Sequence, residues 1–426
     1  MSNKKIVITG IGMLTSVGNG KDATWAAVKA GTPGIGRITR FDPSRCTCQV
    51  GAEVKDFEAY AIGGGLLDKK AARHMALFSQ YAVAAAVEAW KDAGMALPGS
   101  EEGFKADMDR VGTLLGNGIG GLEVTGEAFK TLFDRGPERL SPLAIPELIA
   151  NEGAGNIAIT LGAKGPAQVV TTACASSTDA LGFALDMIRA DRADVMIAGG
   201  AEAVMMEFCV GGFMKEKALA TKFNDTPEKA CRPFNVDRDG FVMGEGAAIL
   251  ILESEEHAKA RGAKIYAELA GYGASCDAYH ITAPDPSADG AVKAIEIALK
   301  NADVTDKTTV DYINAHGTST HLNDQMETAA FKRVFGEEQA KKINISSTKP
   351  FHGHCLGATG AIEAALTALA IQDSYCPATI NYENPDPELD LNYTPNVGVT
   401  RDIRVAVSTS LGFGGHNGVL VFKKYN

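Results

Sequence analysis

The sequence predicts a layered α/β protein. Apolar, β-branched segments of strand length alternate with helical segments along the whole chain of 426 residues, the pattern of helices packed on a sheet. The 47 glycines exceed the usual share of about 7%, which suits many tight turns between strands and helices. A hydrophobic content of 45% and a charged content of 22% are those of an ordinary globular protein.

Strands are predicted from the N-terminal apolar run to the C-terminal end of the chain. They cover residues 5–10, 111–116, 167–172, 195–200, 247–253, 265–272, 310–315, 343–347, 404–410 and 418–424. Helices are predicted between them. They cover residues 22–30, 70–95, 122–133, 144–160, 177–190, 255–261, 288–301, 323–335 and 357–372. The charged helix at 255–261 is a natural division between two halves, although no direct sequence repeat is visible.

Charge and composition exclude several classes of protein. A net charge of −11 argues against nucleic acid as a partner. The apolar run at the N-terminus is too short for a signal sequence, and no apolar stretch reaches the length of about 18 residues that a membrane helix needs. The eight cysteines are scattered, without zinc-type pairing. We therefore expect a cytoplasmic protein in a reducing compartment, without a membrane segment or a bound metal.

Cys174 stands where an apolar strand turns into an Ala-rich helix, in Thr171-Thr172-Ala173-Cys174-Ala175-Ser176-Ser177. A thiol at this junction faces unpaired backbone N–H groups and the positive end of the helix dipole, and both favour the thiolate. Free cysteines are more often buried and inert, so the other motifs decide between these interpretations.

Three further strand ends are polar and rich in glycine. His316 follows the strand at 310–315, Lys349 and His354 follow the strand at 343–347, and Phe413 lies in the Gly412-Phe413-Gly414-Gly415 turn after the strand at 404–410. Loops at strand ends carry the functional sites of α/β folds. By contrast, Gly10-x-Gly12 and the glycines at 116–121 lack the other residues of a phosphate loop, so we interpret them as tight turns.

Taken together, these motifs resemble those of the β-ketoacyl-[acyl-carrier-protein] synthases, in particular the type II branch of these thiolase-superfamily condensing enzymes. The motifs are Thr172-Ala173-Cys174, Asn314-Ala315-His316-Gly317-Thr318-Ser319-Thr320, Lys349 with Gly353-His354, and Gly412-Phe413-Gly414-Gly415. The likeness runs over nearly the whole chain. It implies a duplicated, thiolase-like five-layer αβαβα sandwich with halves at 1–260 and 261–426.

The resemblance also implies roles for the motif residues. Cys174 would accept the acyl group, and His316 and His354 would stabilise an enolate oxygen. The backbone N–H groups of Cys174 and Phe413 would bind the second oxyanion, and Lys349 would pair with a carboxylate. That carboxylate is Glu363, on the helix that follows His354.

The substrates implied are acyl- and malonyl-acyl-carrier-protein, whose phosphopantetheine arm enters the site; no other cofactor is expected. Thr318 and Thr320 would bind this arm, Ile119 would gate the acyl pocket and Phe213 would form its wall, although the same residues also fit turn and core positions. Docking of the acidic carrier protein is assigned to five basic residues, with a solvated helix face as the alternative. They are Lys69, Lys70, Arg73, Lys215 and Lys217.

The leading functional hypothesis is therefore the decarboxylating condensation of malonyl-acyl-carrier-protein with a Cys174-bound acyl chain in fatty acid elongation, by a homodimer. A catalytic ketosynthase of a type II polyketide or aryl-polyene pathway would keep the same residues. A non-catalytic chain-length factor is disfavoured by Cys174, and a thiolase by the two histidines. Pro350, Phe351, His352 and His321 depart from the family pattern and are candidates for reshaping the pocket or its entrance.

Overall fold

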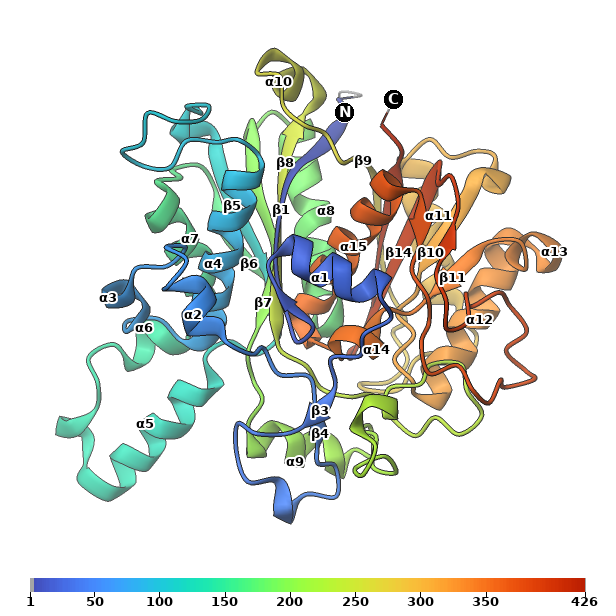
Figure 1. The fold of residues 1–426 in the computed structure, drawn as a ribbon, viewed down its shortest axis with the longest axis horizontal. Helices are drawn as coiled ribbons and strands as arrows, with labels where there is room; N and C mark the ends of the chain where they lie inside the picture. The colour runs from blue at the N-terminus through green and yellow to red at the C-terminus, as the bar shows by residue number, and fades with distance from the viewer. Residues whose placement is uncertain (1–3, 426) are drawn as a thin grey trace.

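The computed structural model describes residues 4–425 and is built around one large mixed sheet (Figure 1). The strands of this sheet are β1 (Ile6–Thr15), β2 (Gly18–Asn19), β5 (Val111–Gly116), β6 (Ala167–Val170), β7 (Val195–Glu202), β8 (Gly246–Ser254), β9 (Ala267–Cys276), β10 (Val310–Asn314), β11 (Asn344–Ser346), β14 (Val405–Gly412) and β15 (His416–Lys423). Two small sheets pair β3 (Gly36–Arg37) with β4 (Val50–Gly51) and β12 (Tyr375–Cys376) with β13 (Val399–Thr400).

The α-helices lie between these strands in the chain. They are α1 (Lys21–Lys29), α2 (Phe57–Ala61), α3 (Lys69–Ala72), α4 (Leu77–Asp92), α5 (Leu122–Arg135), α6 (Ala144–Leu148), α7 (Glu152–Leu161), α8 (Ser176–Arg189), α9 (Glu207–Lys215), α10 (Glu255–Ala260), α11 (Asp289–Asn301), α12 (His321–Phe335), α13 (Glu337–Ala340), α14 (Lys349–His352) and α15 (Thr359–Asp373). None of the helices within 4–425 has both the length and the apolar character needed to cross a membrane.

The sheet has the same strand order on both sides of its centre. From one edge it runs β6-β5-β7-β8-β1, and from the other β11-β10-β14-β15-β9. The pairings match as well, because the three outer strands of each set are parallel and the two inner ones join antiparallel. Within residues 4–425, the two sets pair with each other only where Ile6–Ile8 of β1 lies beside Ala267–Leu269 of β9. One topology therefore occurs twice in the chain, although the sequence shows no repeat.

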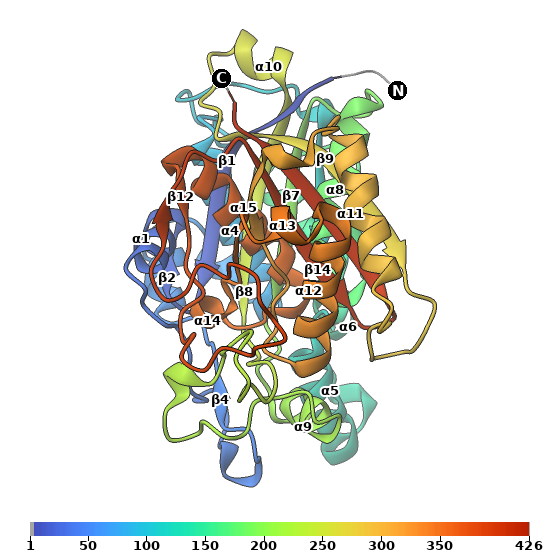
Figure 2. The same cartoon turned by 90° about the vertical axis from the view of Figure 1, so that its right-hand side faces the viewer.

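Helices form the other layers of the fold. α8 and α15 contact strands of both sets and lie between them, and every residue of α15 from Thr359 to Ile371 is buried. α4 and α7 cover the outer face of the first set, while α11 packs on the outer face of the second set and against α12 (Figures 1 and 2). The five-layer αβαβα arrangement implied by the resemblance is thus confirmed. The division into halves at 1–260 and 261–426 stays a prediction.

Two of the predicted helices are interrupted, and four helices were not predicted: α2, α9, α13 and α14. The helix expected at 70–95 splits into α3 and α4, and Leu77, the first residue of α4, donates its N–H to the Glu123 carboxylate at 2.9 Å. The helix expected at 144–160 splits into α6 and α7. α9 was not predicted because Gly211 and Gly212 lower its helix propensity. In each case tertiary contacts outweigh the local sequence signal.

Candidate active site

Cys174 lies on a sharp turn between β6 and α8. Ala173, the residue before it, has a φ of 51°, an uncommon backbone conformation for a residue with a side chain. Ser176 holds the turn closed, because its hydroxyl accepts the Thr172 N–H at 2.9 Å and donates to the Ala173 carbonyl at 2.6 Å. The Cys174 side chain is partly exposed to an adjacent cavity of about 410 Å³. The turn thus presents the sulfur at the cavity wall.

The thiol of Cys174 is protonated in the resting protein. Burial raises its pKa to about 12, and the Lys349 ammonium and the backbone N–H groups of Phe413 and of Cys174 itself offset only part of this rise. The sequence predicted the opposite direction from the helix end alone. That prediction is wrong for the resting state, because desolvation of the charged sulfur outweighs the helix dipole and the neighbouring donors. The sulfur needs a base at the moment of attack.

His354 is placed to be that base. Its Nε2 lies 3.1 Å from Cys174 Sγ, and its Nδ1 lies 2.9 Å from the Thr359 hydroxyl. Burial, with the Lys349 charge as the next cause, holds the pKa of His354 well below 6.5, so the ring is neutral. A hydroxyl can either donate or accept, so Thr359 is compatible with both neutral forms of the ring. In one form Nε2 has no proton and can accept one, and in the other Nε2 carries the proton and can donate it.

His316 is fixed by a buried Lys349–Glu363 pair. Lys349 Nζ donates to Glu363 Oε1 at 2.5 Å and to the His316 carbonyl, and it lies 3.4 Å from His316 Nδ1. A donor at Nδ1 leaves the proton of the neutral ring on Nε2. Burial and the Lys349 charge keep the pKa of His316 well below 6.5. Burial also raises the pKa of Glu363, and the Lys349 ammonium opposes that rise.

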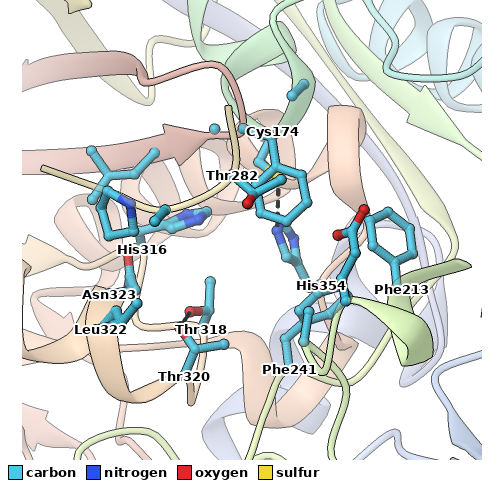
Figure 3. A pocket seen from close by; sticks show the side chains of 18 of the residues that line it. Cys174, Phe213, Phe241, Thr282, His316, Thr318, Thr320, Leu322, Asn323 and His354 are labelled. Carbon is cyan, nitrogen blue, oxygen red and sulfur yellow. Dashed lines mark hydrogen bonds between the residues drawn. The ribbon is translucent and has the colours of Figure 1, made fainter. Parts of the chain in front are cut away.

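Cys174, His316 and His354 converge although they come from three separate segments of the chain (Figure 3). Their sulfur and ring nitrogen atoms lie within 4.8 Å of one another, and the two imidazole rings are 5.2 Å apart and nearly perpendicular. Phe413 lines the same cavity, and its backbone N–H, like that of Cys174, lowers the pKa of the thiol. The site therefore combines a nucleophile, a neutral base, a second imidazole donor and two backbone donors.

The residues predicted to bind substrate line the same cavity. Thr318 and Thr320 lie on its wall with their hydroxyls 2.9 Å apart, and Ile119 and Phe213 line it as well. Phe213 also lies 6.2 Å from the Phe413 ring. Of the residues that depart from the family pattern, His321 lines this cavity, whereas Pro350, Phe351 and His352 are buried away from it. Pro350, Phe351 and His352 are therefore not part of the cavity wall.

The five predicted docking residues are exposed but do not form one patch. Lys69 and Lys70 lie on α3 with Arg73 at its end, and Figure 1 shows α3 well away from α9, which ends at Lys215. Within residues 4–425, only Lys217 of the five lines the cavity. The sequence could not reveal this separation, because the list of basic residues along a chain does not show which of them lie on the same surface of the folded protein.

Three buried side chains near the site were missed by the sequence analysis. Glu327 accepts the N–H groups of His316 and Gly317 at 2.7 and 2.8 Å, and Thr359 bonds to His354 as described above. Glu202 accepts three backbone N–H groups, from Gly118, Ile119 and Gly357, and burial raises its pKa to about 7. Their partners are mostly backbone groups from distant segments, which leave no local sequence pattern.

Comparison with known proteins identifies the family. The model of the β-ketoacyl synthase N-terminal domain matches residues 3–258, and that of the C-terminal domain matches residues 266–383. The chain belongs to the β-ketoacyl synthase family.

Individual relatives cover the full length of the chain. It is 48% identical to the 3-oxoacyl-[acyl-carrier-protein] synthase 2 of Staphylococcus aureus (strain COL) over 423 residues, covering 99% of both chains. It is also 48% identical to the protein of the same name from Synechocystis, covering 100% of this chain and 99% of the relative. A solved β-ketoacyl synthase from Burkholderia phymatum superposes with a TM-score of 0.89 at 34% identity, over 99% of this chain and 100% of the other.

A polyketide ketosynthase is also similar in structure. The complex described as a type II PKS acyl-carrier protein with its ketosynthase bound to the hexaketide contains a chain that superposes with a TM-score of 0.90. That chain is 34% identical, and the match covers 100% of both chains.

Proposed function

We propose that this protein is a 3-oxoacyl-[acyl-carrier-protein] synthase of fatty acid elongation, an acyltransferase that joins an acyl chain to a malonyl unit with loss of CO₂. The observation that carries the proposal is the convergence of Cys174 Sγ with the ring nitrogens of His316 and His354 within 4.8 Å. The names of the full-length relatives at 48% identity support fatty acid elongation. The polyketide ketosynthase is less similar, at 34% identity, and a chain-length factor is disfavoured by Cys174.

The first half-reaction transfers the acyl group to Cys174. The sulfur attacks the thioester carbonyl of acyl-carrier-protein, and its proton passes to His354 Nε2, 3.1 Å away. The backbone N–H groups of Cys174 and Phe413, which lower the pKa of the Cys174 thiol, stabilise the oxyanion of the tetrahedral intermediate. When the carbon–sulfur bond to the phosphopantetheine arm breaks, the proton on His354 passes to the departing thiolate. The products are acyl-Cys174 and a free carrier thiol.

The second half-reaction makes the new carbon–carbon bond. The carbon–carbon bond to the malonyl carboxylate breaks, CO₂ leaves, and the electron pair forms an enolate on the thioester. Nε2–H groups of His316 and His354 donate to the enolate oxygen; a neutral ring is a suitable donor because both pKa values lie well below 6.5. The enolate carbon attacks the carbonyl of acyl-Cys174, the carbon–sulfur bond breaks, and the departing Cys174 thiolate takes up a proton from water to restore the resting thiol. These steps need no resident metal or organic cofactor.

Partners follow from the same proposal. Acyl carrier protein delivers both substrates through a phosphopantetheine arm, which Thr318 and Thr320 are placed to contact in the cavity. Lys217, exposed at this cavity, is the basic residue best placed to attract an acidic carrier near the mouth. The basic residues of α3 would attract it at a second location, because α3 lies apart from α9.

A second copy of the chain is the proposed partner for an exposed region around β6 and α5. β6 is the edge strand of its half, and its first two residues, Ala167 and Gln168, are exposed. None of the 14 residues of α5 is buried, and its stacked Phe129 and Phe133 are 52% and 79% exposed. Apolar edges and faces of this kind invite association. A symmetric homodimer would cover both and place the segment at 140–145 against the partner's site.

Replacing Cys174 tests the nucleophile. Cys174→Ala is expected to abolish transfer of the acyl group from acyl-carrier-protein to the protein, because it removes the sulfur that His354 Nε2 and the two backbone donors contact. Mass spectrometry of the intact protein and its peptides measures the adduct, with Cys276→Ala as a control, since Cys276 is the exposed cysteine. A stable adduct on another residue, with Cys174 unmodified in the wild type, contradicts the assignment.

Replacing the histidines tests the enolate stabilisers. His316→Ala and His354→Ala are each expected to lower CO₂ release from malonyl-carrier-protein by about 100-fold or more, the usual effect of removing one oxyanion donor. Radiolabelled CO₂ release measures this step, and circular dichroism checks the fold. His280→Ala, at an exposed histidine outside the cavity lining, is the matched control. Release at the wild-type rate in both site variants would refute the mechanism.

Dilution tests the homodimer. Analytical ultracentrifugation is expected to show a dimer whose condensation activity falls as it dissociates, because the partner completes the site. Phe133→Glu, which places a charge on the exposed face of α5, is expected to shift the equilibrium toward monomer. A fully active monomer at every concentration would disprove this prediction.

A further inference from the structure

Asp179 is a buried carboxylate to which the condensation mechanism gives no role. It lies in the first turn of α8, five residues after Cys174, and is 5% exposed. Its Oδ2 accepts the Thr172 hydroxyl at 2.6 Å and its Oδ1 accepts the Tyr272 hydroxyl at 2.8 Å. Thr172 belongs to the turn that presents Cys174, whereas Tyr272 lies on β9 in the other half of the sheet. One carboxylate therefore ties the Cys174 turn to the second half of the fold.

The packing around Asp179 leaves it little freedom. A Cβ on Gly418 of β15 would lie 2.8 Å from Asp179 Oδ1, and a Cβ on Gly182 would lie 2.2 Å from the Tyr272 ring. Both contacts are closer than ordinary van der Waals distance, so only glycine lets the carboxylate and the phenol approach in this way. The Tyr272 ring is also held edge-on by Phe183 at 5.7 Å. The Thr172–Asp179–Tyr272 contacts thus form a rigid unit, here called the Asp179 clamp.

The Asp179 clamp lies next to the two backbone donors at the Cys174 sulfur. A Cβ on Gly412 would lie 2.8 Å from the Thr172 carbonyl and 3.1 Å from the Cys174 nitrogen, so the strand end that carries Phe413 touches the Cys174 turn. Thr178 Oγ1 and Ser410 Oγ are 2.7 Å apart and join α8 to the same strand, β14. The two N–H donors therefore come from opposite halves of the fold, and their relative position depends on how α8 and the turn before it are held.

We propose that Asp179 is a positioning residue for acyl transfer. Through its hydrogen bonds to Thr172 and Tyr272 it fixes the position of the Cys174 turn relative to the backbone N–H of Phe413. The inference rests on the proposed function but concerns one half-reaction only. Acyl transfer needs both N–H groups in place at the oxyanion, and a displacement of about 1 Å costs up to about 100-fold in rate. Decarboxylation depends on the two imidazoles, which the Asp179 clamp does not contact.

Three variants test the Asp179 clamp, two at its single contacts and one at the carboxylate that makes both. Thr172→Val and Tyr272→Phe each delete one hydroxyl without changing charge, and Asp179→Asn removes the carboxylate. Thr172→Ser keeps a hydroxyl and is expected to behave like the wild type. The matched control is Asp186→Asn, an exposed position on the same helix. Should Asp179→Asn fail to fold, the two single-hydroxyl variants still carry the test.

The first readout separates the two half-reactions. Thr172→Val and Asp179→Asn are expected to slow acylation of Cys174 by acyl-carrier-protein by about 10- to 100-fold, with malonyl decarboxylation changed by no more than about twofold. Acylation at the wild-type rate, or an equal fall in both half-reactions, would overturn the proposal, because the second result is that of general destabilisation. A wild-type protein that performs neither half-reaction instead contradicts the proposed function.

The second readout does not depend on that function. The backbone N–H groups of Phe413 and Cys174 lower the pKa of the Cys174 thiol, so a turn that moves away from Phe413 raises it. The pH profile for alkylation of Cys174 by iodoacetamide is therefore expected to shift to higher pH in the charge-neutral Thr172→Val variant, and to stay in place in Thr172→Ser and Asp186→Asn. An unshifted profile in Thr172→Val would contradict the proposal even if the protein is not a synthase.

Discussion

Lys349 brings an ammonium group into a part of the fold where its side chain is fully buried and is surrounded by protein groups rather than by water. An isolated charge there would cost several kcal/mol, and the Glu363 carboxylate at 2.5 Å and the His316 carbonyl offset that cost. Burial is the largest cause of the pKa shifts of His316, His354 and Cys174, and the charge of Lys349 is the next. That charge adds to the effect of burial at the two histidines, which keeps them neutral, and opposes it at the Cys174 thiol.

The duplicated topology explains why these groups meet. The strand ends that carry Cys174, His316, His354 and Phe413 meet at one cavity, and α8 and α15 lie between the two halves of the sheet. Cys174 comes from the first half, whereas His316, His354 and Phe413 come from the second. The distances between them are therefore fixed by the packing of the two halves, and the turn that carries Cys174 must be anchored across that boundary.

Much of this arrangement was predictable from the sequence. The alternation of strands and helices and the polar, glycine-rich strand ends pointed to the layered fold and to Cys174, His316, Lys349 and His354. The sequence did not reveal what depends on burial. The helix end at Cys174 suggests a lowered thiol pKa, but desolvation dominates. Glu327 escaped notice because its carboxylate binds the backbone of a segment 10 and 11 residues away, and no residue pattern records such a contact.

The central claim is that His316 and His354 are both neutral when they act on the malonyl unit. NMR of protein labelled with ¹⁵N-histidine measures the protonation of each ring, with His316→Ala and His354→Ala to assign the signals and free histidine in the same buffer as a reference. Because burial and the Lys349 charge hold both pKa values well below 6.5, the account predicts that both rings stay neutral as the pH falls from 8 through 6.5. Titration of either ring near pH 6.5 would contradict it.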